Sequence, residues 1–328
     1  HNASSNPILT DCTFENHSGI QDGGGMYNAS SSPTLTNCAF TDNSADLGGG
    51  MYSRFSSPML IDCTFTGNSG HRGGGMYNTN SGDPILIGCA FTSNSADENG
   101  GGMRNFASSP TLTDCTFTSN SAYDGGGMYN IVAIPSLTSC TFENNSSSQD
   151  GGGMYNASST TTLTSCTFVD NAADADGGGM YSESSSPALN GCTFTNNSAD
   201  TGGGMHDLNF STPSLADCTF AGNSSVFDGG GMYNYDRSEP TLDNCTFTSN
   251  SAGNGGGMHN FSSSSPTLTD CAFTSNSVTG LFSKGGGMYN ESSSPILIGC
   301  TFAINSATGN FSTGGGMWNY DGSEPTLE

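Results

Sequence analysis

The sequence predicts an all-β fold, a right-handed parallel β-helix of about twelve coils with three short strands in each coil. Cysteine recurs twelve times at intervals of 25 to 29 residues, so one repeat is about 26 residues long. Every Cys has a Leu three residues before it and a Phe two residues after it, and every Gly triplet is followed by Met. No stretch has helical periodicity, and the Gly and Pro content opposes helices. Repeats of this length indicate stacked, quasi-one-dimensional folds.

Each repeat contains three motifs that are expected to form strands. In one coil these motifs are TLT at residues 111–113, CTFT at residues 115–118 and GGMY at residues 126–129. Cys115 and Phe117 are two residues apart and therefore point to the same side of a strand. Leu112 lies three residues before Cys115, so a bend must separate them. Each strand is expected to pair in parallel with its copy one coil later, and the right hand follows from the general bias of parallel crossovers.

Stacking places equivalent side chains in files of Met, Leu, Cys and Phe, which explains how a chain with only 33% hydrophobic residues can form a core. An Asn three residues after the Phe, present in eleven repeats, is expected to form an internal amide ladder. The Cys file is interpreted as free buried thiols, because strands lie ~4.8 Å apart whereas disulfides need Cβ atoms ~3.8 Å apart. Disulfides between adjacent coils are the alternative. Metal binding would need Cys or His residues clustered at short spacing, and the sequence contains no CxxC.

The 328 residues are interpreted as one domain, residues 1–328, because each coil contacts only its neighbours. The formal net charge is −24, with five Lys and Arg residues, which argues against nucleic acids and anionic membranes as partners. The sequence has no transmembrane run, so no membrane insertion is expected. An acidic, Lys-poor chain rich in Ser, Thr and Asn is typical of an extracellular or cell-surface protein, and also of a high-salt habitat.

The two ends of the sequence interrupt the repeat. His1-Asn2 matches the end of the MHN motif at Met258–Asn260, and Glu328 stands just before the next Cys is due. We therefore expect either a window from a longer repeat protein or a protomer that stacks end to end, with itself as a partner.

Acidic residues precede several Gly triplets, and Asp124, Asp150 and Asp176 do so in three consecutive coils. Stacked carboxylates repel one another unless they are protonated, splayed or bridged by a cation, and calcium prefers such oxygen ligands. The alternatives are a calcium site and a solvated acidic edge. No other cofactor is expected.

An aromatic residue follows Met in most repeats, and the alternation of a strand points it outward. A ladder of exposed rings could contact a glycan or another protein, or could be an ordinary strand ladder. The candidate contact residues are Tyr129, Tyr155, Tyr181, Tyr233, Tyr289 and Trp318. The loops before the Gly triplets vary most, as in residues 224–228 and the longer 278–284 and 307–313, and variable loops on a regular scaffold usually carry the contacts.

Phe-x-x-Asn, as at Phe40–Asn43 and Phe117–Asn120, alternates with Gly-Gly-x-Met, as at Gly24–Met26. This pattern resembles the repeat of chlamydial polymorphic outer-membrane proteins, although that family has Ile, Leu or Val after Gly-Gly-Ala. The resemblance covers the whole chain and implies a secreted β-helix used in adhesion, with no catalytic residue. The sequence-based expectation is thus a non-catalytic extracellular module that is adhesive or structural and binds a cell-surface or glycan ligand. The alternatives are a self-assembling fibre or sheath subunit, a polysaccharide-active enzyme, and an ice-binding protein suggested by outward Thr pairs such as Thr116 and Thr118.

Overall fold

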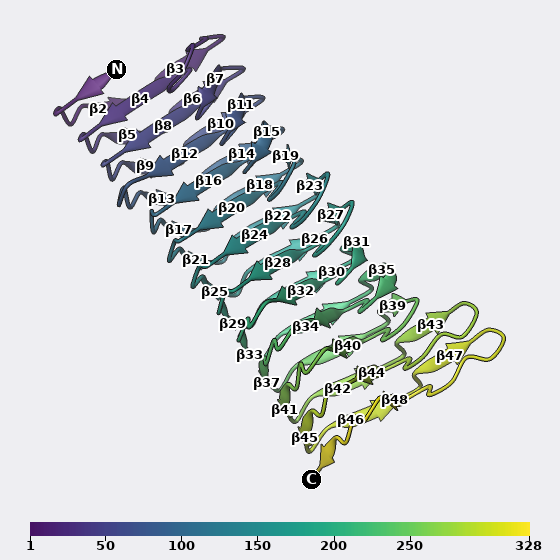
Figure 1. Ribbon diagram of the computed structural model, residues 1–328. Helices are drawn as coiled ribbons and strands as arrows, with labels where there is room; N and C mark the ends of the chain where they lie inside the picture. The colour runs from purple at the N-terminus through teal and green to yellow at the C-terminus, as the bar shows by residue number, and fades with distance from the viewer. The chain divides into compact units, whose positions relative to one another are not determined.

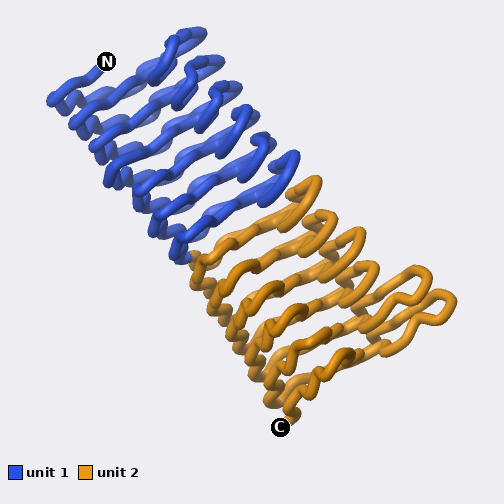
Figure 2. Tube along the Cα trace, in the orientation of Figure 1, with its two compact units in different colours: residues 1–162 blue, residues 163–328 orange.

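The computed structural model describes residues 1–328 and contains strands and turns but no helix. The chain is a parallel β-solenoid of about 13 turns with coils of about 26 residues, which confirms the predicted fold class. Contacts cluster into two compact units, residues 1–162 and residues 163–328 (Figure 2). Each unit is described by itself, and the expectation of a single domain over residues 1–328 stays a prediction.

In unit 1 the strands form four parallel sheets, which we name the Met, Leu, Phe and Ala sheets after their buried residues (Figure 1). The Met sheet contains β1 (Asn2–Ala3), β4 (Met26–Ala29), β8 (Met51–Arg54), β12 (Met76–Thr79), β16 (Met103–Phe106), β20 (Met128–Ile131) and β24 (Met154–Ala157). The Leu sheet contains β2 (Ile8–Thr10), β5 (Thr34–Thr36), β9 (Met59–Ile61), β13 (Ile85–Ile87), β17 (Thr111–Thr113) and β21 (Ser136–Thr138). The Phe sheet contains β3 (Thr13–Glu15), β6 (Ala39–Thr41), β10 (Thr64–Thr66), β14 (Ala90–Thr92), β18 (Thr116–Thr118) and β22 (Thr141–Glu143). The Ala sheet contains β7 (Ser44–Leu47), β11 (Ser69–Arg72), β15 (Ser95–Asn99), β19 (Ser121–Ala122) and β23 (Ser146–Ser147).

Unit 2 has the same four kinds of sheet, and β25 (Thr162–Thr164) precedes them in the chain. Its Met sheet contains β28 (Met180–Glu183), β32 (Met205–Leu208), β36 (Met232–Asn234), β40 (Met258–Phe261), β44 (Met288–Glu291) and β48 (Met317–Tyr320). Its Leu sheet contains β29 (Ala188–Asn190), β33 (Ser214–Ala216), β37 (Thr241–Asp243), β41 (Thr267–Thr269), β45 (Ile296–Ile298) and β49 (Thr326–Leu327). Its Phe sheet contains β26 (Thr167–Val169), β30 (Thr193–Thr195), β34 (Thr219–Ala221), β38 (Thr246–Thr248), β42 (Ala272–Thr274) and β46 (Thr301–Ala303). Its Ala sheet contains β27 (Ala172–Ala173), β31 (Ser198–Thr201), β35 (Ser224–Asp228), β39 (Ser251–Ala252), β43 (Ser277–Thr279) and β47 (Ser306–Thr308).

The prediction of three strands per coil is wrong, because the Ala sheet supplies a fourth. Its strands begin at the Ser that follows the corner Asn, and they pair in parallel from coil to coil, as in Ser69↔Ser95. The next residue is small and inward, as with the buried Ala96. A single inward Ala leaves almost no apolar periodicity over such a short segment, so the sequence pattern gave no strand signal here.

Equivalent residues pair with one another from coil to coil, which forms the predicted files. Phe65 pairs with Phe91, and their ring centroids lie 4.7 Å apart with planes inclined by 4°. Leu86 pairs with Leu112 in the same way. The Phe, Leu and Met side chains that form these files are almost completely buried away from the ends of the chain. The thin core therefore consists of identical side chains stacked at the strand spacing.

Left-handed residues make the corners. Asp114 has φ 52° and turns the chain between Leu112 and Cys115, where the alternation of side chains required a bend. The last Gly of each triplet allows neighbouring coils to approach. A Cβ on Gly102 would lie 2.6 Å from the carbonyl oxygen of Gly127 and 2.8 Å from the ring of Phe117, so only glycine fits.

The predicted amide ladder is present, and a second ladder accompanies it. In the predicted ladder, the Nδ2 atom of Asn94 donates to Oδ1 of Asn120 at 3.0 Å, and both side chains are buried. The second ladder lies inside the Met sheet, where Asn105 Nδ2 donates to Asn130 Oδ1 at 2.9 Å. Its sequence signal is the Asn of the recurrent MYN motif, which sequence reasoning missed.

Candidate interaction surface

The aromatic row after Met forms a stack but does not form the expected exposed surface. The rings of Tyr129 and Tyr155 lie 4.8 Å apart and are stacked, yet both residues are buried. Tyr181, Tyr233 and Tyr289 in unit 2 are also buried, with Tyr289 only 2% exposed. The expectation of outward, solvent-exposed rings is therefore wrong for these residues.

The Tyr row is covered by the residue that precedes each Gly triplet and by the turn of the triplet itself. Lys284 places Nζ 3.5 Å from the hydroxyl of Tyr289. A Cβ on Gly73 would lie 2.8 Å from the Cβ of Tyr77, because the left-handed glycine folds the chain back over the ring. Burial raises the pKa of Tyr52 to about 12. Trp318 is partly exposed and is the one candidate of this row with accessible ring surface.

The acidic residues before the Gly triplets already have protein partners. Asp124 accepts hydrogen bonds from Asn99 Nδ2 at 3.2 Å and from the backbone amide of Asp150 at 3.4 Å. Burial raises the pKa of Asp124 above its usual range. In unit 2, Asp176 lies 3.5 Å from Nδ1 of His206. The described residues contain no group of three or more His, Cys, Asp or Glu side chains that could hold a metal ion. Calcium at Asp124, Asp150 and Asp176 therefore stays a prediction without a formed ligand set.

Two buried histidines replace tyrosines in unit 2 and pair with carboxylates, a feature that sequence reasoning missed. His206 lies near Asp176, and His259 places Nδ1 3.2 Å from Oδ1 of Asp228. Burial opposes ionisation of Asp228, but its hydrogen bond and charge interaction with His259 lower its pKa overall. The signal was present in the sequence as MH in place of MY. These pairs lie beneath the loop residues, so they organise the wall of the solenoid.

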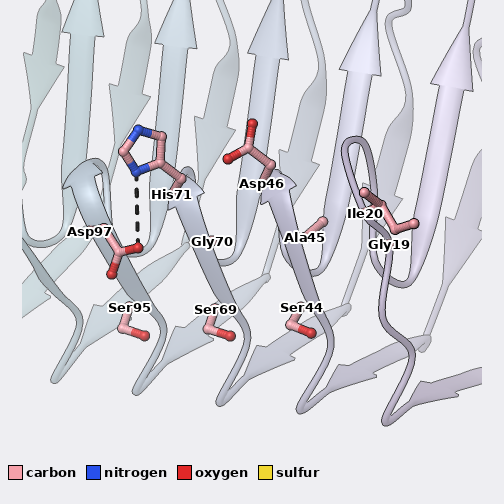
Figure 3. A pocket seen from close by; sticks show the side chains of 10 residues that line it. All are labelled: Gly19, Ile20, Ser44, Ala45, Asp46, Ser69, Gly70, His71, Ser95 and Asp97. Atoms are coloured by element: carbon pink, nitrogen blue, oxygen red, sulfur yellow. Dashed lines mark ion pairs between the residues drawn. The ribbon is translucent and has the colours of Figure 1, made fainter.

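Unit 1 has a polar groove along its Ala sheet (Figure 3). Its volume is about 400 Å³, and Ser44, Ser69 and Ser95 form a row along it. His71 and Asp97 lie at the groove, with Nδ1 and Oδ2 3.9 Å apart. Nε2 of His71 lies 3.1 Å from Glu98 Oε1. These side chains are all substantially exposed, so they contribute little to stability and are available to polar ligands.

Unit 2 has a more apolar groove, which we name the unit 2 groove and define by residues 226–228, 253–254 and 279–284. Its volume is about 530 Å³. Phe227 and Phe282 line it with 55% and 57% of their surface exposed. Phe282 stacks on Phe311 of the next coil, with ring centroids 5.3 Å apart. Asp228 and Lys284 add a charge of each sign to the lining. The lengthened loop of residues 278–284, which the sequence singled out, thus lines a groove that combines apolar rings with polar and charged groups, as ligand sites commonly do.

A second set of exposed aromatic residues lies at the turn between the Met and Leu sheets. Phe55, Phe106 and Phe210 are all exposed. Arg54 and Arg237 place their guanidinium groups 5.2 Å and 5.3 Å from the ring centroids of Phe55 and Phe210. These rings line neither the polar groove of unit 1 nor the unit 2 groove, so they serve as a reference for exposed aromatic residues away from those sites.

The parallel stacking, four-sheet coils and side-chain files define the class of right-handed parallel β-helix proteins. The family model described as right handed beta helix region matches residues 1–132, 53–220 and 209–328, which together cover the whole chain. The chain belongs to this family, and the predicted right hand is confirmed. No curated protein matches the sequence. Right-handed β-helices include both enzymes and non-enzymes, so the family alone does not decide between them. The structure contains no helix long and apolar enough to cross a membrane.

Proposed function

We propose that the chain is a non-catalytic, extracellular β-helix module that binds a cell-surface glycan through the unit 2 groove. The observation that carries this proposal is that exposed apolar side chains gather in the irregular loops of the unit 2 groove, whereas the coils themselves are uniform. Monomeric proteins keep large exposed apolar side chains scattered, and clusters of them mark binding surfaces. Here Val226, Phe227, Leu281 and Phe282 are gathered around one cavity.

The groove has the chemistry that sugars require. Phe227 and Phe282 offer apolar surface to the C–H faces of a pyranose ring. Asp228 and Lys284 can hydrogen-bond hydroxyl groups at fixed positions.

A non-catalytic role is favoured because the acid–base pair at the unit 2 groove has a buried imidazole, with His259 only 3% exposed. The carboxylate of Asp228 faces the buried His259 at 3.2 Å. Adhesion is further supported by the resemblance of the repeat to that of chlamydial polymorphic outer-membrane proteins. An extracellular location fits the net charge of −24 and the burial of the thiols in the interior coils.

The test is binding of the full chain to a glycan array and to intact cells, compared with the variant Phe227→Ser/Phe282→Ser. The matched control is Phe55→Ser/Phe210→Ser, because Phe55 and Phe210 are as exposed, at 56% and 59%, but do not line the unit 2 groove. We expect the groove variant to lose binding at least tenfold and the control to keep it. Equal binding by both variants, or the absence of any glycan or cell binding by the parent chain, would overturn the proposal. Filaments of the parent chain seen by electron microscopy, together with no ligand binding, would favour the alternative of a self-assembling fibre subunit.

A further inference from the structure

The Cys file is unusual in that it brings many free thiols together without forming a single disulfide. None of the twelve cysteines forms a disulfide, and the ten from Cys38 to Cys271 are buried. Strand spacing keeps Cβ atoms of adjacent coils ~4.8 Å apart, which exceeds the ~3.8 Å of a disulfide. The proposed function makes no use of these thiols.

The sulfur atoms occupy equivalent positions in successive coils. In unit 1, the Sγ atoms of Cys63, Cys89 and Cys115 lie 3.4, 3.5 and 3.3 Å from the carbonyl oxygen two residues earlier. Cys89 and Cys115 also lie 3.6 and 3.7 Å from the carbonyl oxygen of the Leu in the preceding coil. One side-chain conformation is therefore repeated, and the sulfurs follow the same translation as the neighbouring Phe rings, which recur at 4.7 to 4.8 Å.

This translation matches the span of a linear bis-thiolate complex. Metal–sulfur bonds to cysteine thiolates are ~2.3 Å long, so a linear S–M–S bridge spans ~4.6 Å. Each of these sulfurs also lies within hydrogen-bonding range of a carbonyl of its own coil. The same arrangement recurs in unit 2 at Cys192 and Cys245, 3.6 and 3.7 Å from the Leu carbonyls of the preceding coils.

We infer that the Cys file is a binding site for soft monovalent metal ions, with Cu(I) as the natural candidate, each ion bridging the thiolates of two adjacent coils. Soft thiolate ligands select Cu(I) over hard cations. In each binding event two S–H bonds break, two S–Cu bonds form and two protons leave to solvent, while copper stays in the +1 state. No oxidant or reductant takes part. Only two donors are needed, so the site does not require a cluster of three ligands.

The stoichiometry is limited by geometry. A sulfur that binds an ion toward the next coil cannot also bind an ion toward the preceding coil without distorting its bond angles. Adjacent thiols are therefore used in pairs, and the twelve cysteines allow about six ions per chain. The walls of the site are apolar, since Leu and Phe files flank the sulfurs, and their burial excludes water.

The experiment is anaerobic refolding of the full chain with Cu(I) against a competing Cu(I) chelator, followed by metal analysis, circular dichroism and X-ray absorption. We expect about six ions per chain, each with two sulfur neighbours, and a higher thermal midpoint than that of the metal-free protein. Two variants with the same number of thiols provide the matched comparison. Cys38→Ala/Cys89→Ala isolates Cys12 and Cys63, and Cys115→Ala/Cys140→Ala leaves adjacent pairs intact.

The variant with isolated thiols is expected to lose about two ions from unit 1, whereas the variant with intact pairs loses about one. Equal losses in the two variants would overturn the inference, as would three or more sulfur neighbours per ion. Copper that is bound only by the unfolded chain and prevents refolding would also overturn it. Hg(II), which forms neutral linear bis-thiolates, serves as a second probe and is expected to show the same difference between the variants.

Discussion

Asp207 interrupts the second amide ladder of unit 2 and offers a sharp test of the structural reasoning. It pairs with Ser182 in the preceding coil and with Asn234 in the next. All three side chains are fully buried. Both carboxyl oxygens of Asp207, the hydroxyl of Ser182 and Oδ1 of Asn234 lack hydrogen-bond partners. We predict that Asp207→Asn stabilises the protein at neutral pH, because an amide at this position can donate to Asn234 Oδ1.

The magnitude follows from proton linkage. Burial raises the pKa of Asp207 well above its usual range, so the folded protein keeps the proton while the unfolded chain loses it near pH ~3.9. Above that pH the folded state binds more protons than the unfolded state, and the free energy of unfolding falls by ~1.4 kcal/mol per pH unit until the folded group ionises. The contribution is present in full below pH ~4 and is lost as the pH rises. Asp207→Asn removes this dependence, so the gain at pH 7 is expected to be roughly 2–4 kcal/mol.

The assay is urea unfolding of the parent protein and Asp207→Asn between pH 3.5 and pH 8. The difference between their free energies of unfolding should be small near pH 4 and should grow with pH, and the contribution of His206 cancels because both proteins contain it. Asn130→Asp is the matched control, since Asn130 accepts from Asn105 at 2.9 Å and donates to Asn156 at 3.0 Å. It should destabilise the protein increasingly as the pH rises. Parallel pH profiles of the parent and Asp207→Asn, or a less stable variant at pH 7, would refute the reasoning.

Three further predictions concern the files and ladders. Asn120→Ala should lower the free energy of unfolding, measured in urea, by at least about 3 kcal/mol. The side-chain amide of Asn120 has buried partners in both neighbouring coils, and its removal breaks four hydrogen bonds. A decrease of less than about 1 kcal/mol would contradict the amide ladder. In the same assay, Phe117→Ala should lower the free energy of unfolding by about 3–5 kcal/mol, because Phe117 is buried. Phe106→Ala should lower it by less than about 0.5 kcal/mol, because Phe106 is exposed. Similar effects of the two substitutions would contradict the stacked core. Tyr52 should stay protonated at pH 10.5 in an ultraviolet titration, because burial raises its pKa to about 12. Tyr52→Phe should therefore leave the tyrosinate absorbance of the folded protein unchanged at that pH, and a loss of tyrosinate absorbance in the variant would contradict this burial.

Much of the fold could be predicted because the positions of identical residues in the repeat define the register between coils. Identical residues recur at a fixed interval, so only in-register stacking places Leu112, Cys115 and Phe117 against their copies in every coil. The bend at Asp114 followed from the odd separation of Leu and Cys. The free thiols followed from the strand spacing. These conclusions need only the length of a residue and the alternation of a strand.

The fourth strand, the buried Tyr row and the unit 2 groove were decided by tertiary structure. Alternation says that a side chain points away from the core, but not what covers it there. Whether Tyr129 is exposed to solvent depends on the path of a loop from the same coil. That path is set by Gly125, the first glycine of the triplet, which has a left-handed conformation. Likewise, Phe282 contributes to a groove only because neighbouring coils align their loops. The sequence by itself determined the repeat, the core files and the spacing of the thiols, because these depend on local geometry. Exposure and cavities depend on how separate segments pack together, and only the folded structure decided them.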